Sequence, residues 1–419
     1  MSSLQTSWYV VMQHNSFAIS PIKSLLVSLG FCLGITAVDA SEWSGQIQAE
    51  GRFFTQEADF GQADEFFSLA FEPEYYHEWE NADWSVTFKP FFRWDSEDSE
   101  RTHGDIRELM FTYVGDVWEV KAGIGKVYWG VAESQHLVDV INQTDFVENV
   151  DGEDKLGQPM LHLSTEQDWG LLEFFVLPYF RERTFAGPDG RLRSPLDIDT
   201  DNPIYASDDE EHNLDAAIRW SRSLGDWELG LAHFSGTSRE PLFVVNTSNP
   251  ANPTLIPLYV TIDQTSLDLQ ATIDAWLWKL EAISRSGFDE DRHWAAVAGF
   301  EYTFYDMQGS GMDLGMILEY QTDSRDFLGA RFKAQDAIVT GFRLAMNDEQ
   351  STEALLSYLH TEDGQKFINL EANRRIGDSW KIILEARYLT GFDENKPFES
   401  VFFQIRNDDY IGISLEKYF

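Results

Sequence analysis

The sequence predicts an all-β protein, a transmembrane antiparallel β-barrel of about 18 strands, and three observations carry this prediction. Apolar and polar residues alternate from Ser41 onward in segments of roughly ten or more residues, which is the period of a strand with two different faces. Short and long connections between these segments alternate along the chain. The last segment ends on an aromatic residue at the chain terminus. Together these features are typical of bacterial outer-membrane barrels.

The closing strand is predicted at residues 408–419. Ile411, Ile413 and Leu415 share one face with the terminal Phe419, and small or polar residues alternate with them. Lys417 breaks the apolar face, but a lysine this close to a strand end can extend to water. The terminal aromatic resembles the signal that the barrel-assembly machinery recognises, so Phe419 is the predicted assembly signal. The last strand of a soluble sheet is the alternative.

Composition agrees with a barrel and excludes other classes. The 419 residues carry a formal charge of −40, so nucleic acid is a poor partner. A mean hydropathy of −0.32 argues against a helical membrane protein, whereas a barrel needs only alternate apolar residues. Apolar residues make up 43% of the chain, too many for a disordered protein.

Residues 1–40 are predicted to be a signal peptide that is removed after Ala40. Lys23 precedes an apolar stretch from Leu25 to Val38, and small residues stand at the cleavage positions. A transmembrane helix is the alternative, but the stretch is short for one. The single cysteine, Cys32, lies in this segment, so the mature chain, residues 41–419, has no disulfide.

Six short connections share one form, in which a Gly or Asp turn residue comes just before a tryptophan. Gly and Asp suit tight turns, and tryptophan suits the boundary between water and lipid. Because these turns fall on alternate connections, they are predicted to lie together at the periplasmic end. They are Asp83–Trp84, Gly115–Trp118, Asp168–Trp169, Gly225–Trp227, Asp274–Trp276 and Gly377–Trp380.

The other connections are longer and mostly acidic, which predicts extracellular loops. Counting the segments gives about eighteen strands, and sixteen is the alternative if the weakly patterned sixth belongs to a plug. The long connections include residues 95–100, 184–211, 238–257 and 323–335.

Alternation also assigns the two faces of each strand. A charged residue that faced hydrocarbon would cost about 2–4 kcal/mol, so charged residues are placed inside and the interior is predicted to be wet. The same pattern turns Asp268, Glu301 and Glu319 inward. The predicted pore-lining residues are Lys89, Arg93, Arg181, Arg219, Lys279, Glu281, Arg285, Arg343, Glu371, Arg375, Lys381, Glu385 and Arg387.

One stretch, residues 123–163, breaks the alternation and carries a resemblance to a known family. The chain resembles a large, mostly uncharacterised family of porin-like outer-membrane barrels of Gram-negative bacteria, related in general plan to alginate-export barrels. The resemblance covers most of the mature chain but is specific at two places, this stretch and the segment 375–419. It implies a location in the outer membrane. Its motif residues are Gly125, Lys126, Trp129 and Gly130, followed by Asp139, Val140, Ile141 and Asn142, with Gln143 where family members often have proline.

Residues 129–157 are predicted to fold into the barrel as a constriction loop, because wide barrels are often narrowed in this way. A loop that packs over the rim is the alternative. The predicted constriction residues are Trp129, Glu133, His136, Asp139, Asn142 and Asp145, with the charged ones opposite basic residues of the strands.

A weak calcium candidate is formed by Asp197, Asp199 and Asp201, whose carboxylates stand at alternate positions. Asn202 occupies the place where a complete calcium loop needs glycine. We therefore expect no cofactor, beyond Ca²⁺ or Mg²⁺ held loosely by acidic loops that bridge to lipopolysaccharide.

The predicted function is a channel for passive diffusion of small hydrophilic solutes. An excess of basic residues in the pore-lining set favours anionic or carboxylated solutes. The alternative is an export conduit or docking barrel of a larger envelope complex, closed when alone. No serine and histidine motif indicates an enzyme. The expected partners are membrane lipid, lipopolysaccharide, the assembly machinery, a small solute and a second copy of the chain.

Overall fold

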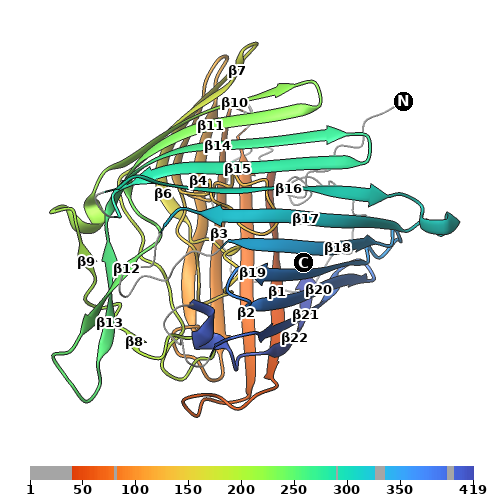
Figure 1. Ribbon diagram of the computed structural model, residues 1–419. Coiled ribbons are helices and arrows are strands. Elements are labelled where there is room, and N and C mark those ends of the chain that lie inside the picture. Colours follow the sequence, from red (N-terminus) through yellow and green to blue (C-terminus); the bar gives the residue numbers. More distant parts are fainter. Residues whose placement is uncertain (1–39, 80–82, 289–290, 326–335, 394–400) are drawn as a thin grey trace, which may run out of the picture. The chain divides into compact units, whose positions relative to one another are not determined.

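The chain forms a closed antiparallel β-barrel of 18 strands, as the sequence predicted. The barrel closes because β1 (Ala40–Phe54) pairs both with β2 (Glu65–Glu78) and with the last strand, β22 (Tyr410–Tyr418) (Figure 1). The predicted signal peptide lies outside the described residues except for Ala40. The computed structural model describes residues 40–79, 83–288, 291–325, 336–393 and 401–419.

The remaining barrel strands follow one another around the ring in chain order. Each is hydrogen-bonded to the strand before it, so the predicted sixth strand belongs to the barrel rather than to a plug. These strands are β3 (Trp84–Asp95), β4 (His103–Val114), β5 (Glu119–Gly125), β6 (Gln158–Gln167), β7 (Gly170–Leu177), β10 (Asp215–Leu224), β11 (Trp227–Thr237), β14 (Thr261–Ile273), β15 (Trp276–Ser286), β16 (His293–Phe304), β17 (Asp313–Asp323), β18 (Ala337–Ala345), β19 (Glu353–Thr361), β20 (Lys366–Ile376) and β21 (Trp380–Thr390).

All six tryptophan turns lie at one end of the barrel. Counted around the ring from β1, each of them follows an even-numbered strand, and neighbouring strands run in opposite directions. Asp274 adopts a left-handed backbone conformation with φ of 55°, and Gly225 does the same with φ of 65°, as tight turns require. Two further connections at this end, 305–312 and 346–352, are longer, and the first contains the 3-10 helix η2 (Met307–Gly309).

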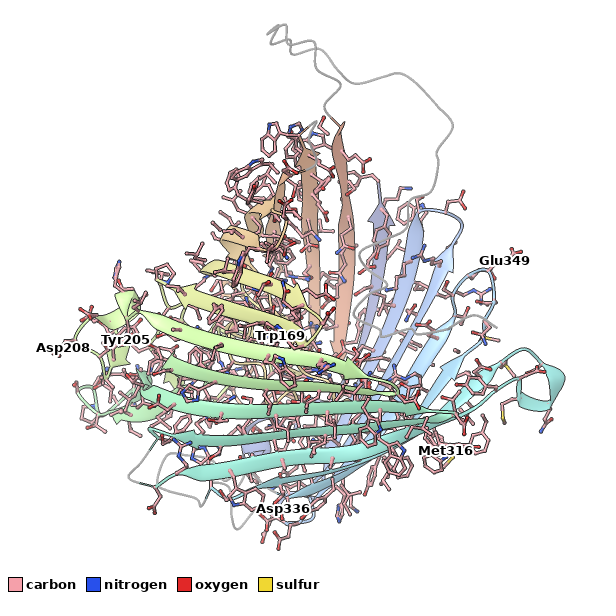
Figure 2. All side chains as sticks on the ribbon, turned by 90° about the horizontal axis from the view of Figure 1, so that it is seen from above. Trp169, Tyr205, Asp208, Met316, Asp336 and Glu349 are labelled. Atoms are coloured by element: carbon pink, nitrogen blue, oxygen red, sulfur yellow. The ribbon has the colours of Figure 1, made fainter. Side chains whose placement is uncertain are left out.

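The opposite end carries the long connections, and two of them form a small sheet that the sequence did not predict. The strands pair as β12 with β13, and β13 also pairs in parallel with β8 and β9. Figure 1 shows this sheet beyond the barrel strands, and Figure 2 shows Tyr205 and Asp208 at the end opposite Glu349. The additional elements are β8 (Asp197–Ile198), β9 (Ile204–Tyr205), η1 (Glu210–His212), β12 (Leu242–Asn246), β13 (Thr254–Tyr259) and η3 (Val401–Ile405).

The outer face of the barrel is apolar, as alternation predicted. On β22 the side chains of Ile411, Ile413 and Leu415 are exposed, whereas the residues between them are buried inside. Lys417 donates a hydrogen bond to Ser379 and lies over the ring of Trp380. Its ammonium group therefore reaches the turn at the strand end rather than hydrocarbon. Among the described residues, no helix is long and apolar enough to cross a membrane.

The main apolar core lies inside the barrel rather than between two layers. It joins inward side chains of β4, β6, β7, β10, β11 and β14 to β16 with residues of the long connection between β5 and β6. This connection therefore positions the candidate functional site.

Candidate functional site

The connection between β5 and β6, residues 126–157, folds into the barrel, and we call it the inner loop. Its base is held by Asn142, whose amide nitrogen donates to the backbone oxygens of Gly125 (2.8 Å) and Leu156 (2.9 Å). The amide oxygen of Asn142 accepts a hydrogen bond from the backbone of Val127 at 2.8 Å. Asn142 is buried, so these bonds fix both ends of the loop beside the strands that it joins.

Glu281 on β15 anchors the loop on one side of the barrel. Its carboxylate accepts hydrogen bonds from the backbone N–H groups of Val131 (2.7 Å), Ala132 (2.8 Å) and Val138 (3.1 Å). The side chain of Glu281 is fully buried. A buried carboxylate that accepts several backbone N–H groups is stabilised in its charged form, and it orders the segment that donates them.

Glu319 on β17 provides a second anchor beside the first. It accepts hydrogen bonds from the backbone N–H of Glu133 (2.8 Å) and from both the backbone (2.9 Å) and the hydroxyl (2.5 Å) of Ser134. The side chain of Glu133 in turn lies 2.6 Å from Arg343 and 3.4 Å from Lys279. Burial opposes the ionisation of Glu133, but these two cations outweigh it and lower the pKa of Glu133.

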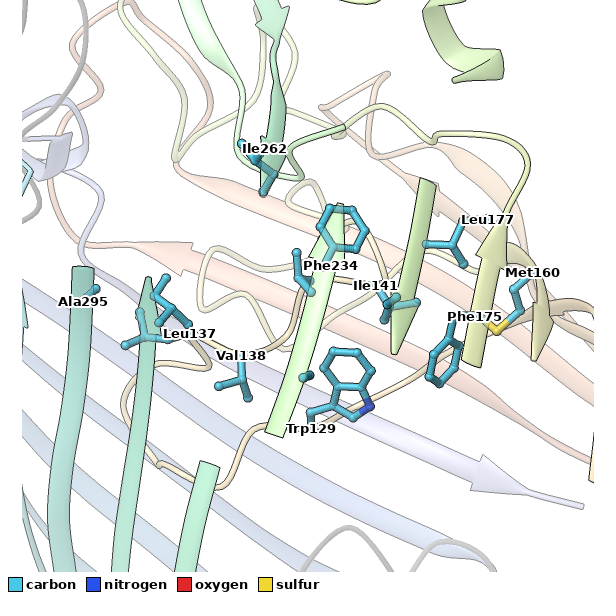
Figure 3. Packing of buried hydrophobic residues seen from close by; sticks show 14 of the residues in the cluster. Trp129, Leu137, Val138, Ile141, Met160, Phe175, Leu177, Phe234, Ile262 and Ala295 are labelled. Atoms are coloured by element: carbon cyan, nitrogen blue, oxygen red, sulfur yellow. The ribbon is translucent and has the colours of Figure 1, made fainter. Parts of the chain in front are cut away.

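Apolar packing holds the middle of the loop against the strands. Figure 3 shows Trp129, Val138 and Ile141 of the loop facing Phe175 and Phe234 of the barrel. The ring centroids of Trp129 and Phe175 are 5.7 Å apart. All five side chains are buried, so removing the loop would expose a large apolar patch on the inside of the barrel.

The far part of the loop reaches the opposite side of the ring. Asp145 lies 2.6 Å from Arg107 on β4, and Glu148 lies 2.7 Å from Arg93 on β3. Asp151 is paired with Arg387 on β21 at 2.7 Å. Because β4 and β17 lie on opposite sides of an 18-strand ring, the inner loop crosses the interior from one side to the other.

Glu148 is the centre of a buried ion-pair network that the sequence did not reveal. Besides Arg93, it contacts His103 at 2.8 Å, and Arg52 donates to its backbone oxygen at 2.9 Å. Burial raises the cost of charging Glu148, but Arg93, His103 and Arg101 outweigh it and hold its pKa well below its usual range. The network therefore ties the inner loop to β1, β3 and β4 through charged hydrogen bonds.

A second segment, residues 178–196 after β7, covers the long-connection end, and we call it the mouth loop. The buried guanidinium of Arg191 donates to Asp408 (2.6 Å) and Asp64 (3.1 Å), which precede β22 and β2. Thr184 donates to Asp145 of the inner loop at 2.7 Å. The mouth loop therefore bridges the inner loop and the strands at the closure of the barrel.

The predicted pore-lining residues on strands face the interior, but most of the basic ones are paired with carboxylates. Arg181 does not lie on a strand, because β7 ends at Leu177 and the alternation was extended too far. It belongs to the mouth loop and pairs with Asp105. The other pairs are Lys89–Glu74, Arg93–Glu50, Arg93–Glu148, Arg219–Asp268, Lys279–Glu133, Arg285–Glu240, Arg343–Glu133 and Arg387–Glu385. Glu371 accepts a hydrogen bond from Asn369. Arg375 and Lys381 lie opposite each other near a turn.

The six predicted constriction residues all lie in the inner loop, but only Glu133 and Asp145 face basic residues of the strands. Asp139 instead accepts hydrogen bonds from the backbone of Trp129 (2.7 Å) and Gly130 (3.0 Å), within the loop. His136 lies between two carboxylates, 2.9 Å from Glu153 and 3.8 Å from Glu281.

The calcium candidate is not assembled as a three-carboxylate cluster. Asp197 pairs with Arg193, and Asp199 accepts a hydrogen bond from Asn202. Within the described ranges, one group of three side chains, His103, Asp145 and Glu148, brings potential ligand atoms within 4.8 Å of one another. Arginine guanidinium groups contact both of its carboxylates, so this group is an ion-pair network.

His136 predicts a response of the inner loop to alkaline pH. Burial disfavours its cation, but Glu153 and Glu281 outweigh burial and raise the pKa of His136 to about 10. A histidine whose pKa is raised by folding stabilises the folded state in its charged form. This contribution is complete below the pKa of about 6.5 in the unfolded chain, and it is lost as pH rises through about 10. We expect the tryptophan fluorescence of the protein, to which the buried Trp129 of the loop contributes, to report a loop transition near that pH. Replacement of His136 by glutamine should abolish the transition, and an identical titration in that variant would contradict the assignment.

Comparison with known proteins gives the fold. No protein-family model matches the sequence, and no curated protein matches it. Wzi of Escherichia coli, described as a carbohydrate-binding β-barrel of the outer membrane involved in group 1 capsule assembly, is similar with a TM-score of 0.50 and 11% identity over 89% of this chain and 84% of Wzi. The fold is that of an outer-membrane β-barrel.

Two further solved barrels are similar at lower scores. OmpT, an outer-membrane protein of Vibrio cholerae in its trimer form, gives a TM-score of 0.44, and a mutant porin of Rh. blastica gives 0.45. Each is 11% identical and covers 91% of this chain and 100% of its own. At these identities the likeness concerns the fold.

Proposed function

We propose that the protein is an outer-membrane channel for passive diffusion of small hydrophilic solutes, narrowed by the inner loop. An 18-strand ring is wide enough to enclose an aqueous channel when side chains do not fill it. The apolar outer face suits a membrane, and the backbone of Phe419, which directly follows β22, pairs with that of Gly45 on β1. These features support insertion into the outer membrane through the terminal strand.

The observation that carries this proposal is the unequal burial of the inward side chains. On β10 to β17 they are buried beneath the inner loop, as Ala217, Phe234 and Val297 illustrate. On β20 and β21 several are only partly buried, as Asn369 and Glu385 illustrate, whereas Leu389 near the end of β21 is buried. The inner loop therefore packs most closely against β10 to β17 and touches β21 through the pair of Asp151 and Arg387, so we propose that the passage runs along β19 and β20.

The charge preference of this passage depends on fewer groups than the sequence suggested. Because most inward arginines and lysines are neutralised by carboxylates, their excess over acidic residues does not by itself favour anions. We still propose a carboxylated solute, and the argument for it rests on a separate cluster at the mouth, described below.

Solute flux tests the proposed channel. Liposomes containing the purified protein should swell faster in arabinose than in the trisaccharide raffinose, because the passage beside the inner loop excludes the larger sugar. Protein-free liposomes are the control. Equal swelling in the two sugars would contradict a narrowed passage, and absence of swelling in arabinose would contradict an open one.

A second candidate is a conduit that is closed when alone, and the contacts of Arg191 favour it. Besides its two carboxylates, Arg191 donates to the backbone oxygens of Asn407 (2.7 Å) and Gln56 (3.1 Å). In this case the wild-type protein should not conduct, and Arg191→Ala should open it by releasing the mouth loop. Conduction by the wild-type protein would exclude this candidate.

A further inference from the structure

Two arginines contact one glutamate inside the long-connection end of the barrel, and a third arginine lies in the neighbouring mouth loop. Glu240, between β11 and β12, lies 3.2 Å from Arg285 of β15 and 2.7 Å from Arg325, which follows β17. Burial opposes its ionisation, but Arg325, Arg285 and Arg183 outweigh it and lower the pKa of Glu240 to about 2. Arg183 belongs to the neighbouring part of the mouth loop: the ring of Phe185, two residues further along, lies 5.7 Å from the ring of Phe243, three residues after Glu240, measured between centroids.

Arg183 differs from the other arginines inside the barrel. Arg93, Arg107 and Arg219 each lie within 4.0 Å of a carboxylate, but among the described residues Arg183 has no such partner. Within the described part of the chain, its guanidinium makes one long hydrogen bond, 3.3 Å, to the side-chain oxygen of Gln143. Since a guanidinium has five N–H donors in a fixed fork, most of the capacity of Arg183 to bind a carboxylate is unused by the protein.

Among the described residues, the cluster carries an excess of positive charge in a strongly acidic protein. Arg325 is also paired with Asp323 at 2.6 Å, so Arg285 and Arg325 share two described carboxylates, and Arg183 adds a third guanidinium group. Arg285 additionally donates to Gln264 at 2.6 Å, which holds its side chain in place. In surroundings that are partly shielded from water, this excess attracts an anion more strongly than the same charges at the surface would.

Glu240 occupies this cluster in a manner that a solute could reproduce. Its side chain is 43% exposed although both oxygens contact arginine, so part of the side chain is accessible from solvent. It belongs to a short segment in which Ser238 holds the backbone of Glu240 through its hydroxyl. A solute carboxylate could therefore displace the Glu240 side chain without moving a barrel strand.

Aromatic rings line the approach to Arg183. The guanidinium carbon of Arg183 lies 5.7 Å from the ring centroid of Phe146 of the inner loop. Phe185 lies 6.5 Å from Phe146, and Phe243 lies 5.7 Å from Phe185, measured between ring centroids. All three rings are partly exposed. Partly exposed rings beside a guanidinium suit a carboxylate attached to a sugar or aromatic ring.

We propose that Arg183, Arg285 and Arg325 form a binding site for a ring-bearing carboxylate solute, and that Glu240 occupies this site when the solute is absent. The inference rests on the proposed channel function, because it assigns the solute class of that channel. Binding itself does not require an open passage, so the two proposals can fail separately.

Calorimetric titration of the purified full-length protein tests the site, with glucuronate and benzoate as carboxylate probes and glucose as the uncharged control. We expect a carboxylate to bind and glucose not to bind. Arg183→Gln should weaken binding about tenfold, as expected for the loss of a charged hydrogen bond. Glu240→Gln should strengthen binding several-fold by removing the competing charge. Preference for glucuronate would indicate a sugar acid, and preference for benzoate an aromatic acid.

A matched control is Arg374→Gln, which removes an arginine at the opposite end of the barrel, where it pairs with Asp348. It should leave binding unchanged. Absence of binding by either carboxylate, or equal binding by the wild-type and Arg183→Gln proteins, would overturn the proposed site. Binding without solute flux would retain the site and reject the open channel.

Discussion

Replacing the inner loop by a short turn should raise the single-channel conductance several-fold. Gly125 and Gln158 lie directly opposite each other on β5 and β6, so a four-residue turn can join them without disturbing the barrel ladder. The replacement removes residues 126–157 from the interior and widens the path for ions. Planar-bilayer recordings of the wild-type and shortened proteins measure the effect.

The same replacement will also destabilise the protein. Phe175, Phe234 and Ile262 lose their apolar cover, at a cost of about 1.5–3 kcal/mol for each side chain that becomes fully exposed. The barrel hydrogen bonds do not depend on the loop, so we expect a lower unfolding temperature and a retained barrel. The matched control replaces the turn 346–352, whose flanking residues Ala345 and Glu353 are also paired. That control should leave conductance unchanged, and an equal rise in both variants would contradict the role of the inner loop.

Glu281→Gln should loosen the inner loop without removing it. The glutamine side chain has nearly the same shape as glutamate, but an NH₂ group replaces one acceptor oxygen. This NH₂ group is a donor and cannot accept hydrogen bonds from the N–H groups of the loop. Leaving a buried donor unsatisfied costs about 1–3 kcal/mol, and Glu281 serves three of them. We expect a noisier and larger channel current and a lower unfolding temperature.

Glu349→Gln is the control for this substitution, because Glu349 is exposed on the turn between β18 and β19 (Figure 2). This substitution should change neither the channel current nor the unfolding temperature. A Glu281→Gln protein with wild-type noise and conductance would show that the backbone contacts of Glu281 do not hold the loop in place.

The fold could be predicted from the sequence because a barrel repeats one simple pattern. Alternation identifies both faces of a strand, and the tryptophan turns identify one end, so strand number and orientation follow without long-range information. The prediction failed where the alternation of apolar and polar residues ended. Arg181 was placed on a strand that stops at Leu177. The sheet of β8, β9, β12 and β13 lies in the segments 184–211 and 238–257, which were predicted to be long loops.

The candidate site was only partly predictable for a related reason. Glu281 and Glu319 were correctly turned inward, but alternation cannot show that they accept backbone N–H groups from a segment far away in the chain. The network of Arg107 and Glu148 and the cluster of Arg183 and Glu240 join elements on different parts of the ring. No local spacing links such residues, so their pairing appears only in the folded barrel.

The measurement that tests the central claim most directly is the single-channel conductance of the purified wild-type protein in a planar bilayer under a salt gradient. A passage beside a docked inner loop predicts steady steps, smaller than those of the protein in which residues 126–157 are replaced, with a reversal potential that gives the charge preference. A wild-type protein that stays silent, or one whose steps equal those of the shortened protein, would contradict a channel narrowed by the inner loop.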